Sequence, residues 1–256
     1  MTTPLSTSRL NLAPASAAVR DLLAPSGVLR VGVNMSNFLL VTGRTPDGDP
    51  VGVSPDMAAA FAEHLGVGVK LLPYASPGPV ADAAPKDEWD IALIGAEPQR
   101  AEVIAFTPAY CEIEATYLVP ASVSLKTIAD VDAPGVRIAV APRTAYGLWL
   151  ERNIKNATLV HSESPEEAFA NFVENKLDAL AGLRPGLIGE VGKVPGSRLV
   201  PGSYTAVQQA IGTPKAKAAA LAEMVRFVEA AKASGFVAEL IAKYGVEGRL
   251  SVAPVA

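Results

Sequence analysis

The chain has 256 residues, half of them hydrophobic, and a formal net charge of −4. This length and apolar content suffice for one large domain or two smaller lobes with cores of their own, and they exclude a disordered chain. Charges of both signs are interspersed without a basic run, which argues against nucleic acid or an anionic membrane surface as a partner.

The first 25 residues carry three charged side chains and are interrupted by Pro4 and Pro14 before Pro25. They therefore contain no continuous apolar core of the kind that a secretory signal needs. We expect residues 1–25 to form an extension ahead of the first strand. No run of about 18 apolar residues occurs in the sequence, which predicts no direct insertion into a membrane.

Strands and helices alternate after this extension. The segment Val28 to Val33 alternates branched apolar residues with small or charged ones and is typical of a strand. Ser54-Pro55 combines an N-cap residue with a first-turn proline, and it predicts a helix that ends at Gly66. Val67 to Leu72 has strand character again, so this part of the chain is predicted to be a β-α-β unit.

The next segments have the character of short strands joined by tight turns. Ile91 to Ile94 is an apolar run that we interpret as a buried strand, and strand-like residues resume at Val103 to Phe106. Thr116 to Val119 is predicted to be extended and is followed by Pro120. Here we place the first crossing between two lobes.

A second α/β series follows. Ser164 and Glu167 have the spacing of a capping box, in which each side chain binds the backbone amide of the other residue, and they predict the start of a helix. The other elements expected in this series are a strand at Val136 to Ala141, a helix at Thr144 to Asn153, a strand at Thr158 to His161, a strand at Leu177 to Ala181, a helix after Pro185 and a strand near Arg198 to Val200.

The end of the chain returns to the first lobe. Thr205 to Ile211 is predicted to be the returning strand, and Thr213-Pro214 to cap a long helix that includes the alanine-rich run Lys215 to Ala222. The fold class predicted is α/β, with mostly parallel sheets flanked by helices. We expect residues 1–119 and 203–256 to form lobe 1 and residues 120–202 to form lobe 2.

Cofactor and metal chemistry find little support in the sequence. Cys111 is the single cysteine, so no internal disulfide or multi-thiolate site is possible, and its apolar neighbours predict a buried thiol. His64 and His161 lie far apart and are interpreted as structural residues at a helix end and a strand end. Gly32 stands alone near the end of the first strand, so the glycine pattern of a nucleotide site is missing, and no cofactor is predicted.

Several motifs occur together in an order that resembles the family 3 solute-binding proteins of ABC transporters. They are Val53-Ser54-Pro55-Asp56-Met57, Leu65-Gly66-Val67, Trp89-Asp90-Ile91-Ala92, Pro98-Gln99-Arg100-Ala101, Phe106-Thr107-Pro108-Ala109-Tyr110 and Lys176-Leu177-Asp178-Ala179-Leu180-Ala181-Gly182. The resemblance covers nearly everything after about residue 27. It implies a periplasmic-binding-protein type II fold, in which two lobes joined by two hinge strands close on a small solute.

The resemblance also implies partners and a location. They are a small-molecule ligand, an ABC transporter permease, a monomeric state, and the periplasm or the extracellular space. Because no signal is visible in residues 1–25, a cytoplasmic location stays open.

The resemblance assigns Arg100 to the position that grips the carboxylate of an amino-acid ligand. A planar guanidinium suits that bidentate contact, although a surface arginine paired with Glu97 or Glu102 is the alternative. Arg143 and Thr144 follow a strand and could bind an anion, or Thr144 could simply cap a helix while Arg143 faces solvent.

By the same resemblance, Leu183 stands where amino-acid binders place an aspartate for the ligand's ammonium group, and Arg184 follows it. A leucine cannot neutralise a buried ammonium. With Arg100, Arg143 and Arg184 as candidate cations, the expected ligand is anionic, a carboxylate or a phosphorylated compound. Glu97 or Glu114 could still replace the missing acid and restore amino-acid binding.

Polar and aromatic side chains complete the candidate site. Asn34 and Asn37 follow the first strand and could read hydroxyl or carbonyl groups, or could make turns. Phe38, Tyr110 and Tyr146 could wall the cleft or belong to the core. Gln208 and Gln209 lie in the returning strand, where one of them is expected to face the hinge.

Two other classes of function remain open. Some proteins of the same fold are cyclohexadienyl dehydratases, and such an enzyme would use Glu97 or Glu114 as a general acid. A cytosolic ligand sensor is the third possibility. The sequence favours a binding protein without catalytic residues for uptake by an ABC transporter.

Overall fold

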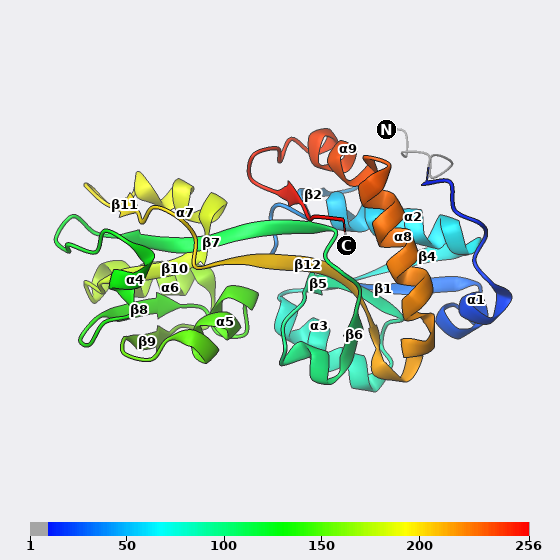
Figure 1. Ribbon diagram of the computed structural model, residues 1–256, viewed down its shortest axis with the longest axis horizontal. Coiled ribbons are helices and arrows are strands. Elements are labelled where there is room, and N and C mark those ends of the chain that lie inside the picture. The colour runs from blue at the N-terminus through cyan, green and yellow to red at the C-terminus, as the bar shows by residue number, and fades with distance from the viewer. Residues whose placement is uncertain (1–9, 256) are drawn as a thin grey trace. The chain divides into compact units, whose positions relative to one another are not determined.

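Strand and helix alternation builds two units in the computed structural model, which describes residues 10–255. Unit 1 contains the chain up to Glu112 and from Gln208 onward, and unit 2 contains Ile113–Val207. Unit 1 therefore joins the blue and cyan elements from the beginning of the chain to the orange and red ones from its end (Figure 1). The divisions fall inside two long strands, whereas the sequence had suggested divisions just outside them.

The strands of unit 1 bring several carboxyl ends to one edge of a sheet. The order is β4 (Gly68–Tyr74), β1 (Val28–Asn34), β5 (Ile91–Gly95) and β12 (Thr205–Pro214). Strand β1 is parallel to both β4 and β5, and β12 is antiparallel to β5. Asn34, Tyr74 and Gly95 end the three parallel strands, so they lie at the same edge.

Short strands extend this arrangement at its margins. Strand β6 (Ile104–Phe106) pairs antiparallel with β12, and β13 (Ser251–Val252) pairs antiparallel with the first residues of β7 (Cys111–Val119). A separate hairpin is formed by β2 (Gly43–Arg44) and β3 (Pro50–Val51).

Helices cover both faces of the unit 1 sheet. They are α1 (Ala17–Leu23), α2 (Val53–Leu65), α3 (Pro77–Ala83), α8 (Leu221–Ala233) and α9 (Phe236–Lys243), with 3-10 turns η2 (Ala84–Lys86), η3 (Arg100–Glu102) and η4 (Lys215–Ala220). Helix α3 packs in a cluster that takes alternate residues of two strands, Leu72 and Tyr74 with Ala92 and Ile94. Ile91 and Leu93 are also buried, and they point to the opposite face because side chains alternate along a strand.

The predicted helix start at Thr213-Pro214 is wrong. Both residues complete β12, where they pair with Ala105 and Ile104 of β6. The hydroxyl of Thr213 donates to the carbonyl oxygen of Asp90 at 2.9 Å, so it caps no helix. The alanine-rich run begins as the 3-10 turn η4, and α8 begins only at Leu221.

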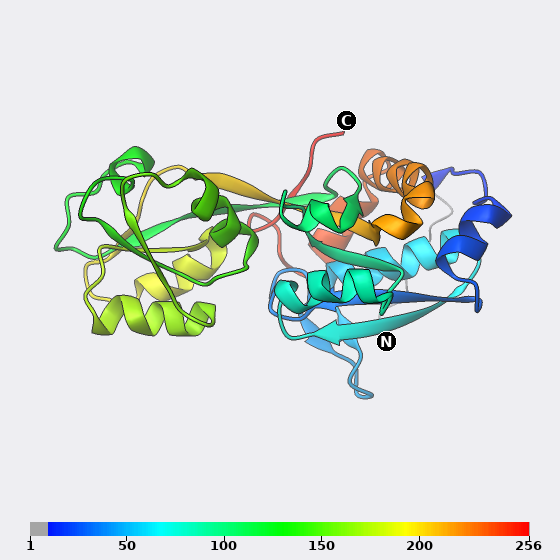
Figure 2. The same cartoon turned by 90° about the horizontal axis from the view of Figure 1, so that it is seen from below.

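The described part of the expected extension, residues 10–25, packs on unit 1, while residues 1–9 lie outside the described residues. Helix α1 begins at an N-cap, Ser16, whose hydroxyl accepts from the amide of Val19 at 3.3 Å. Leu10, Leu23 and Ala24 are buried, and α1, the dark blue helix in Figure 2, contacts η4. These residues therefore belong to the core of unit 1.

Unit 2 is a smaller α/β layer structure. Its strands lie in the order β7, β10 (Ala179–Leu183), β8 (Arg137–Val140) and β9 (Thr158–His161), with β11 (Arg198–Leu199) on the other side of β7. Strand β8 is parallel to β9 and β10, whereas β7 is antiparallel to β10 and β11. The helices are α4 (Ile128–Val131), α5 (Ala145–Asn153), α6 (Pro165–Glu174) and α7 (Arg184–Val191).

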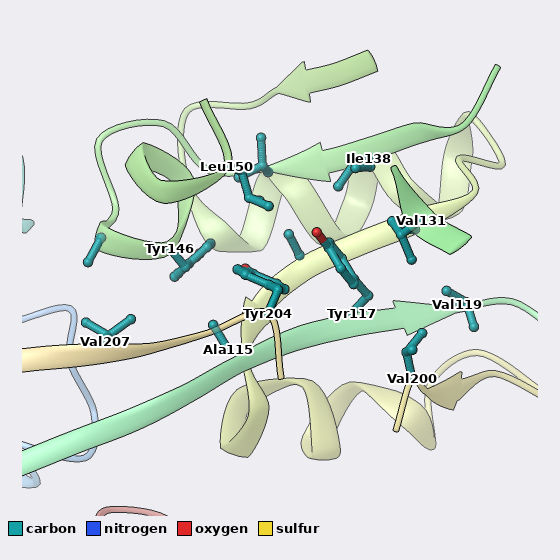
Figure 3. Packing of buried hydrophobic residues seen from close by; sticks show 14 residues of the cluster. Ala115, Tyr117, Val119, Val131, Ile138, Tyr146, Leu150, Val200, Tyr204 and Val207 are labelled. Carbon is teal, nitrogen blue, oxygen red and sulfur yellow. The ribbon is translucent and has the colours of Figure 1, made fainter. Parts of the chain in front are cut away.

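Alternation along the strands divides the unit 2 core into two clusters. One face contributes Tyr117, Ile138 and Ala181 to a cluster shared with α5 (Figure 3). The other face contributes Leu118 and Ala139, among others, to a cluster that includes residues of α6 and α7. Both faces of the sheet are thus covered, as the apolar strands predict.

Helix α6 begins where the capping box predicts, but with a different partner. The hydroxyl of Ser164 accepts from the amide of Glu167 at 3.1 Å. The carboxylate of Glu167 accepts from the amide of Glu163 at 3.0 Å, one residue before the expected amide of Ser164. Within residues 10–255, none of the helices is both long and apolar enough to cross a membrane.

Candidate functional site

The edge of unit 1 where β1, β4 and β5 end is the first candidate surface. The amide of Met35, just after β1, donates to the carbonyl oxygen of Tyr74 at the end of β4, at 2.9 Å. Ligands of α/β proteins lie at such carboxyl ends, where the loops leaving neighbouring strands meet. The loop after β1 and the loop after β5 therefore define this site.

The loop after β1 uses its asparagine side chains to make turns. The Asn34 side-chain oxygen accepts from the amide and the hydroxyl of Ser36, at 3.1 and 2.8 Å. The Asn37 side-chain oxygen accepts from the amide of Leu39 at 3.2 Å. The turn-forming interpretation therefore accounts for both oxygens. Within the second turn Phe38 has 46% of its surface exposed, so it is available to a ligand.

The start of α2 is tied to this loop by a backbone contact that requires glycine. Gly52 has a φ of +153°, and a β-carbon there would lie 2.2 Å from the carbonyl oxygen of Leu40. The amide of Ser54 donates to that same oxygen at 3.1 Å. The Ser54 hydroxyl is 3.0 Å from the Tyr110 hydroxyl, and Tyr110 is fully buried, which raises the pKa of its phenol. Of the two possibilities for Tyr110, a residue that lines the cleft or a residue of the core, the structure therefore supports the core.

The loop after β5 holds two buried charged residues, Glu97 and Arg100. They are 8% and 4% exposed, so Arg100 is no surface arginine. One terminal nitrogen of the Arg100 guanidinium, Nη1, donates to the carbonyl oxygen of Gly95, the last residue of β5, at 2.6 Å. The amide of Ala96 donates to the carbonyl oxygen of Gln208 at 2.7 Å, which fixes the loop to β12.

The second candidate surface is the edge of unit 2 where β8 and β10 end. Thr144 is the N-cap of α5: its hydroxyl accepts from the amide of Gly147 at 3.1 Å and donates to the carbonyl oxygen of Ala141 at 2.8 Å. A β-carbon on Gly147 would lie 2.6 Å from that carbonyl oxygen, so only glycine fits. Arg143 adopts a left-handed conformation with φ +59°. The capping interpretation of Thr144 is therefore the one that the geometry supports.

Leu183 and Arg184 lie at the same edge, and Arg184 has an acidic partner. Its Nε atom lies 2.5 Å from a carboxylate oxygen of Glu114, and a terminal nitrogen donates to the carbonyl oxygen of Gly202. Leu183 packs against the apolar cluster of α5. The charge of Arg184 is thus balanced within unit 2, which weakens its role as a third cation for an anionic ligand.

An aromatic group beside α5 was only partly predicted. Tyr146 is 7% exposed, and its burial raises the pKa of its phenol to about 12. The centroid of the Tyr204 ring lies 4.6 Å from that of Tyr117 (Figure 3) and 5.3 Å from that of Trp149. Trp149 stands three residues after Tyr146, a helical spacing that the sequence does display, but no local signal places Tyr117 or Tyr204 beside them.

The remaining predicted positions are structural. Cys111 is buried, which raises the pKa of its thiol. His64 lies in the last turn of α2 with its Nε2 atom 2.6 Å from a carboxylate oxygen of Glu223, and His161 ends β9. Among residues 10–255 no three histidine, cysteine or acidic side chains come together as a metal site would require.

A comparison with protein families finds a family model that matches most of the chain. The model of the bacterial extracellular solute-binding proteins, family 3, matches residues 29–247. A curated relative, the cyclohexadienyl dehydratase of Pseudomonas aeruginosa, is 28% identical over 164 residues. That match covers 62% of this chain and 60% of the relative, so the chain matches less than two thirds of the relative's length.

Solved structures show the same fold at low sequence identity. An amino acid ABC transporter substrate-binding protein of Streptococcus pneumoniae, bound to L-arginine, matches with a TM-score of 0.69 at 19% identity, covering 88% of this chain and 97% of that one. A putative ABC transporter binding component of Wolinella succinogenes, complexed with lysine, matches with a TM-score of 0.70 at 20% identity, covering 87% and 97%.

The ancestral amino acid-binding protein AncCDT-1, described as a precursor of cyclohexadienyl dehydratase, matches with a TM-score of 0.69 at 22% identity, covering 88% and 98%. These neighbours establish the α/β fold of periplasmic binding proteins, type II.

Proposed function

Because the chain belongs to the bacterial extracellular solute-binding proteins, family 3, we propose that it captures a small solute bearing a carboxylate and presents it to an ABC transporter permease. The observation that carries this proposal is the buried Arg100 at the carboxyl edge of the unit 1 sheet, held by the carbonyl oxygen of Gly95 at 2.6 Å. Binding involves no covalent step, and the protein acts in the periplasm or outside the cell.

The side chain of Arg100 is positioned before any ligand arrives. A guanidinium is a planar fork of five donors, a geometry that suits a carboxylate. A buried guanidinium that is already oriented loses little conformational entropy on binding. Both features favour a tight and directional contact with a carboxylate group.

The ligand class follows from charges near the two candidate edges. An anionic ligand was expected because three arginines were candidate cations for it, but one of them, Arg184, is paired with Glu114. Relatives of the same fold have been solved with arginine and lysine, which share a carboxylate with organic acids. Leu183 supplies no acid for an ammonium group. The carboxylate is therefore the feature that we assign to the ligand.

The test is isothermal calorimetry with six compounds: L-arginine, L-lysine, L-phenylalanine, 3-phenylpropanoate, citrate and glycerol 3-phosphate. At least one carboxylate is expected to bind, and Arg100→Lys is expected to weaken that binding about 10-fold to 100-fold, because lysine cannot make the bidentate contact. Circular dichroism checks the fold, since Arg100 is buried and the substitution can also cost stability.

Arg44→Lys is the matched control. Arg44 also donates to a glycine carbonyl oxygen, that of Gly48, but it is exposed in the β2–β3 hairpin. Its replacement is expected to leave binding unchanged. Equal affinities of the Arg100→Lys variant and the parent protein would refute the role of Arg100, and no binding of any carboxylate would count against the function.

A second candidate is a dehydratase, favoured by the curated relative and by the buried Glu97 three residues before Arg100. A general acid that protonates a departing hydroxyl group would need to lie beside the carboxylate anchor, as Glu97 does in sequence. Incubation with prephenate or arogenate tests this candidate. Formation of an aromatic product that Glu97→Gln abolishes would favour the enzyme over the binding protein.

A further inference from the structure

The hydroxyl group of Tyr204 is enclosed and makes no hydrogen bond to any residue within 10–255. The side chain is 8% exposed, and burial raises the pKa of its phenol well above the usual value, so the hydroxyl keeps its proton at neutral pH. A buried hydroxyl without a partner destabilises the folded state, whereas phenylalanine at the same position would not. Packing alone therefore does not explain why this position has a tyrosine hydroxyl.

The backbone around Tyr204 is held firmly. The amide of Tyr204 donates to the carbonyl oxygen of Ala115 at 3.0 Å. The hydroxyl of the fully buried Thr116 contacts the carbonyl oxygens of Val200 and Gly202, at 3.1 and 2.9 Å, and so fixes the preceding turn. With rings on two sides, Tyr117 at 4.6 Å and Trp149 at 5.3 Å, the phenol has a defined direction.

That direction leads to the candidate edge of unit 2. Ala115 pairs with Leu183 across β7 and β10, so Tyr204, Ala115 and Leu183 lie in one row at the carboxyl end of β10. The hydroxyl of Tyr204 points toward Tyr146, in the first turn of α5 (Figure 3). It thus approaches the edge at which β10 ends at Leu183.

We propose that Tyr204 is a specificity-determining residue of unit 2, whose hydroxyl donates a hydrogen bond to an oxygen of the bound solute once the side chain of Tyr146 turns aside. This inference rests on the proposed function. A phenol and a leucine at this edge suit an acceptor oxygen beside an apolar or aromatic group, and they give no counter-charge to an ammonium. Among the compounds above, 3-phenylpropanoate has this chemistry and L-phenylalanine adds an ammonium to the same skeleton.

The experiment compares two tyrosine to phenylalanine variants. Tyr204→Phe removes a hydroxyl without a partner, so its melting temperature is expected to equal or exceed that of the parent, while its affinity for the tightest-binding compound of the six falls about 5-fold to 20-fold. Tyr244→Phe is the control, because the Tyr244 hydroxyl donates to a carboxylate oxygen of Asp56 at 2.7 Å. It is expected to lower the melting temperature and to leave affinity unchanged.

The outcomes separate this inference from the function on which it rests. If the parent binds a compound and Tyr204→Phe binds it equally well, the inference is overturned and the proposed function stands. A loss of stability in Tyr204→Phe as large as that in Tyr244→Phe would show that the hydroxyl has a structural partner, and would also overturn it. If the parent binds none of the six compounds, both proposals fall together.

Discussion

Each unit begins its central parallel strands with the same arginine–aspartate clamp, which we define as Arg30 with Asp90 in unit 1 and Arg137 with Asp178 in unit 2. One Asp90 carboxylate oxygen accepts from the amide and the Nε atom of Arg30, at 2.8 and 3.1 Å. Asp178 repeats both contacts with Arg137, at 2.9 and 3.0 Å. In each clamp the aspartate amide donates back to the arginine carbonyl oxygen.

The turns that enter the two clamps are also alike. Asp87 and Lys176, just before the two aspartates, adopt left-handed conformations with φ of +53° and +47°. Arg30 donates to the carbonyl oxygen of Asp87, and Arg137 to that of Lys176. In both units the chain therefore passes in the same order through a helical turn, a left-handed residue and the aspartate of the clamp before it enters a parallel strand.

The clamps differ in depth and in the charges around them. The Asp90 side chain is 1% exposed and also accepts from the ammonium of Lys217 at 2.6 Å. The Asp178 side chain is 25% exposed and faces an arginine that is 43% exposed. Water screens the charges of Arg137 and Asp178. The burial of a clamp therefore determines its contribution to stability more than its hydrogen-bond geometry does.

The largest effect is expected from Asp90→Asn. The asparagine can still accept from the Arg30 amide, but Arg30 and Lys217 lose the buried negative charge between them, which should cost about 3 kcal/mol of unfolding free energy. The measurement is urea unfolding followed by fluorescence in a Trp149→Phe background, where the buried Trp89 reports on unit 1. A loss below about 1 kcal/mol would mean that burial does not set the difference between the clamps.

A smaller effect is expected from Asp178→Asn, the matched change in unit 2. Because the pair is partly exposed, its loss should cost about 0.5 to 1 kcal/mol. Urea unfolding in a Trp89→Phe background, which leaves Trp149 as the reporter of unit 2, gives the value. If this variant lost as much stability as Asp90→Asn, the two clamps would be equivalent and the comparison would fail.

The smallest effect is expected from Asp87→Asn, and it depends on pH. The hydrogen bond from Lys217, with the charges of Lys217 and Arg30, lowers the pKa of the Asp87 carboxyl below its usual value. The folded state therefore binds its proton less readily than the unfolded state, so the stabilisation is complete above the unfolded pKa near 4 and is lost as pH falls through the folded pKa.

The Asp87 side chain is 66% exposed, so water screens its charge. At pH 7 the free energy of unfolding of the parent protein should therefore exceed that of Asp87→Asn by less than about 1 kcal/mol. Unfolding curves of both proteins between pH 7 and about pH 3 should converge on the acid side. A difference that stayed constant over this range would show that the charge of Asp87 contributes nothing.

Sequence patterns succeeded where the physics is local. The stop at Gly66, the helix that begins near Thr144 and the strand at Ile91 depend on neighbours in the chain, and all three occur as expected. The pattern failed at Thr213-Pro214, because the partner of the Thr213 hydroxyl, the carbonyl oxygen of Asp90, is brought there only by the pairing of β12 with β5.

The candidate site shows the same division. Chain order alone indicated that Arg100 and Leu183 follow strands, and the family motifs suggested what each position does. Only the folded chain paired Arg184 with Glu114, buried Tyr110 against Ser54, and brought Tyr204 beside Trp149. These contacts join residues that are distant in sequence, and no periodicity or cap reports them.

By itself the sequence determined the alternation of strands and helices, the start and end of most of them, and a family of solute-binding proteins. These follow from hydrophobic periodicity and backbone preferences, which act over a few residues. The tertiary structure alone decided which charges are neutralised, which side chains are buried and, among residues 10–255, that the Tyr204 hydroxyl makes no hydrogen bond. Such properties depend on sheet register and on packing between distant segments, because burial and electrostatic pairing are set by spatial neighbours.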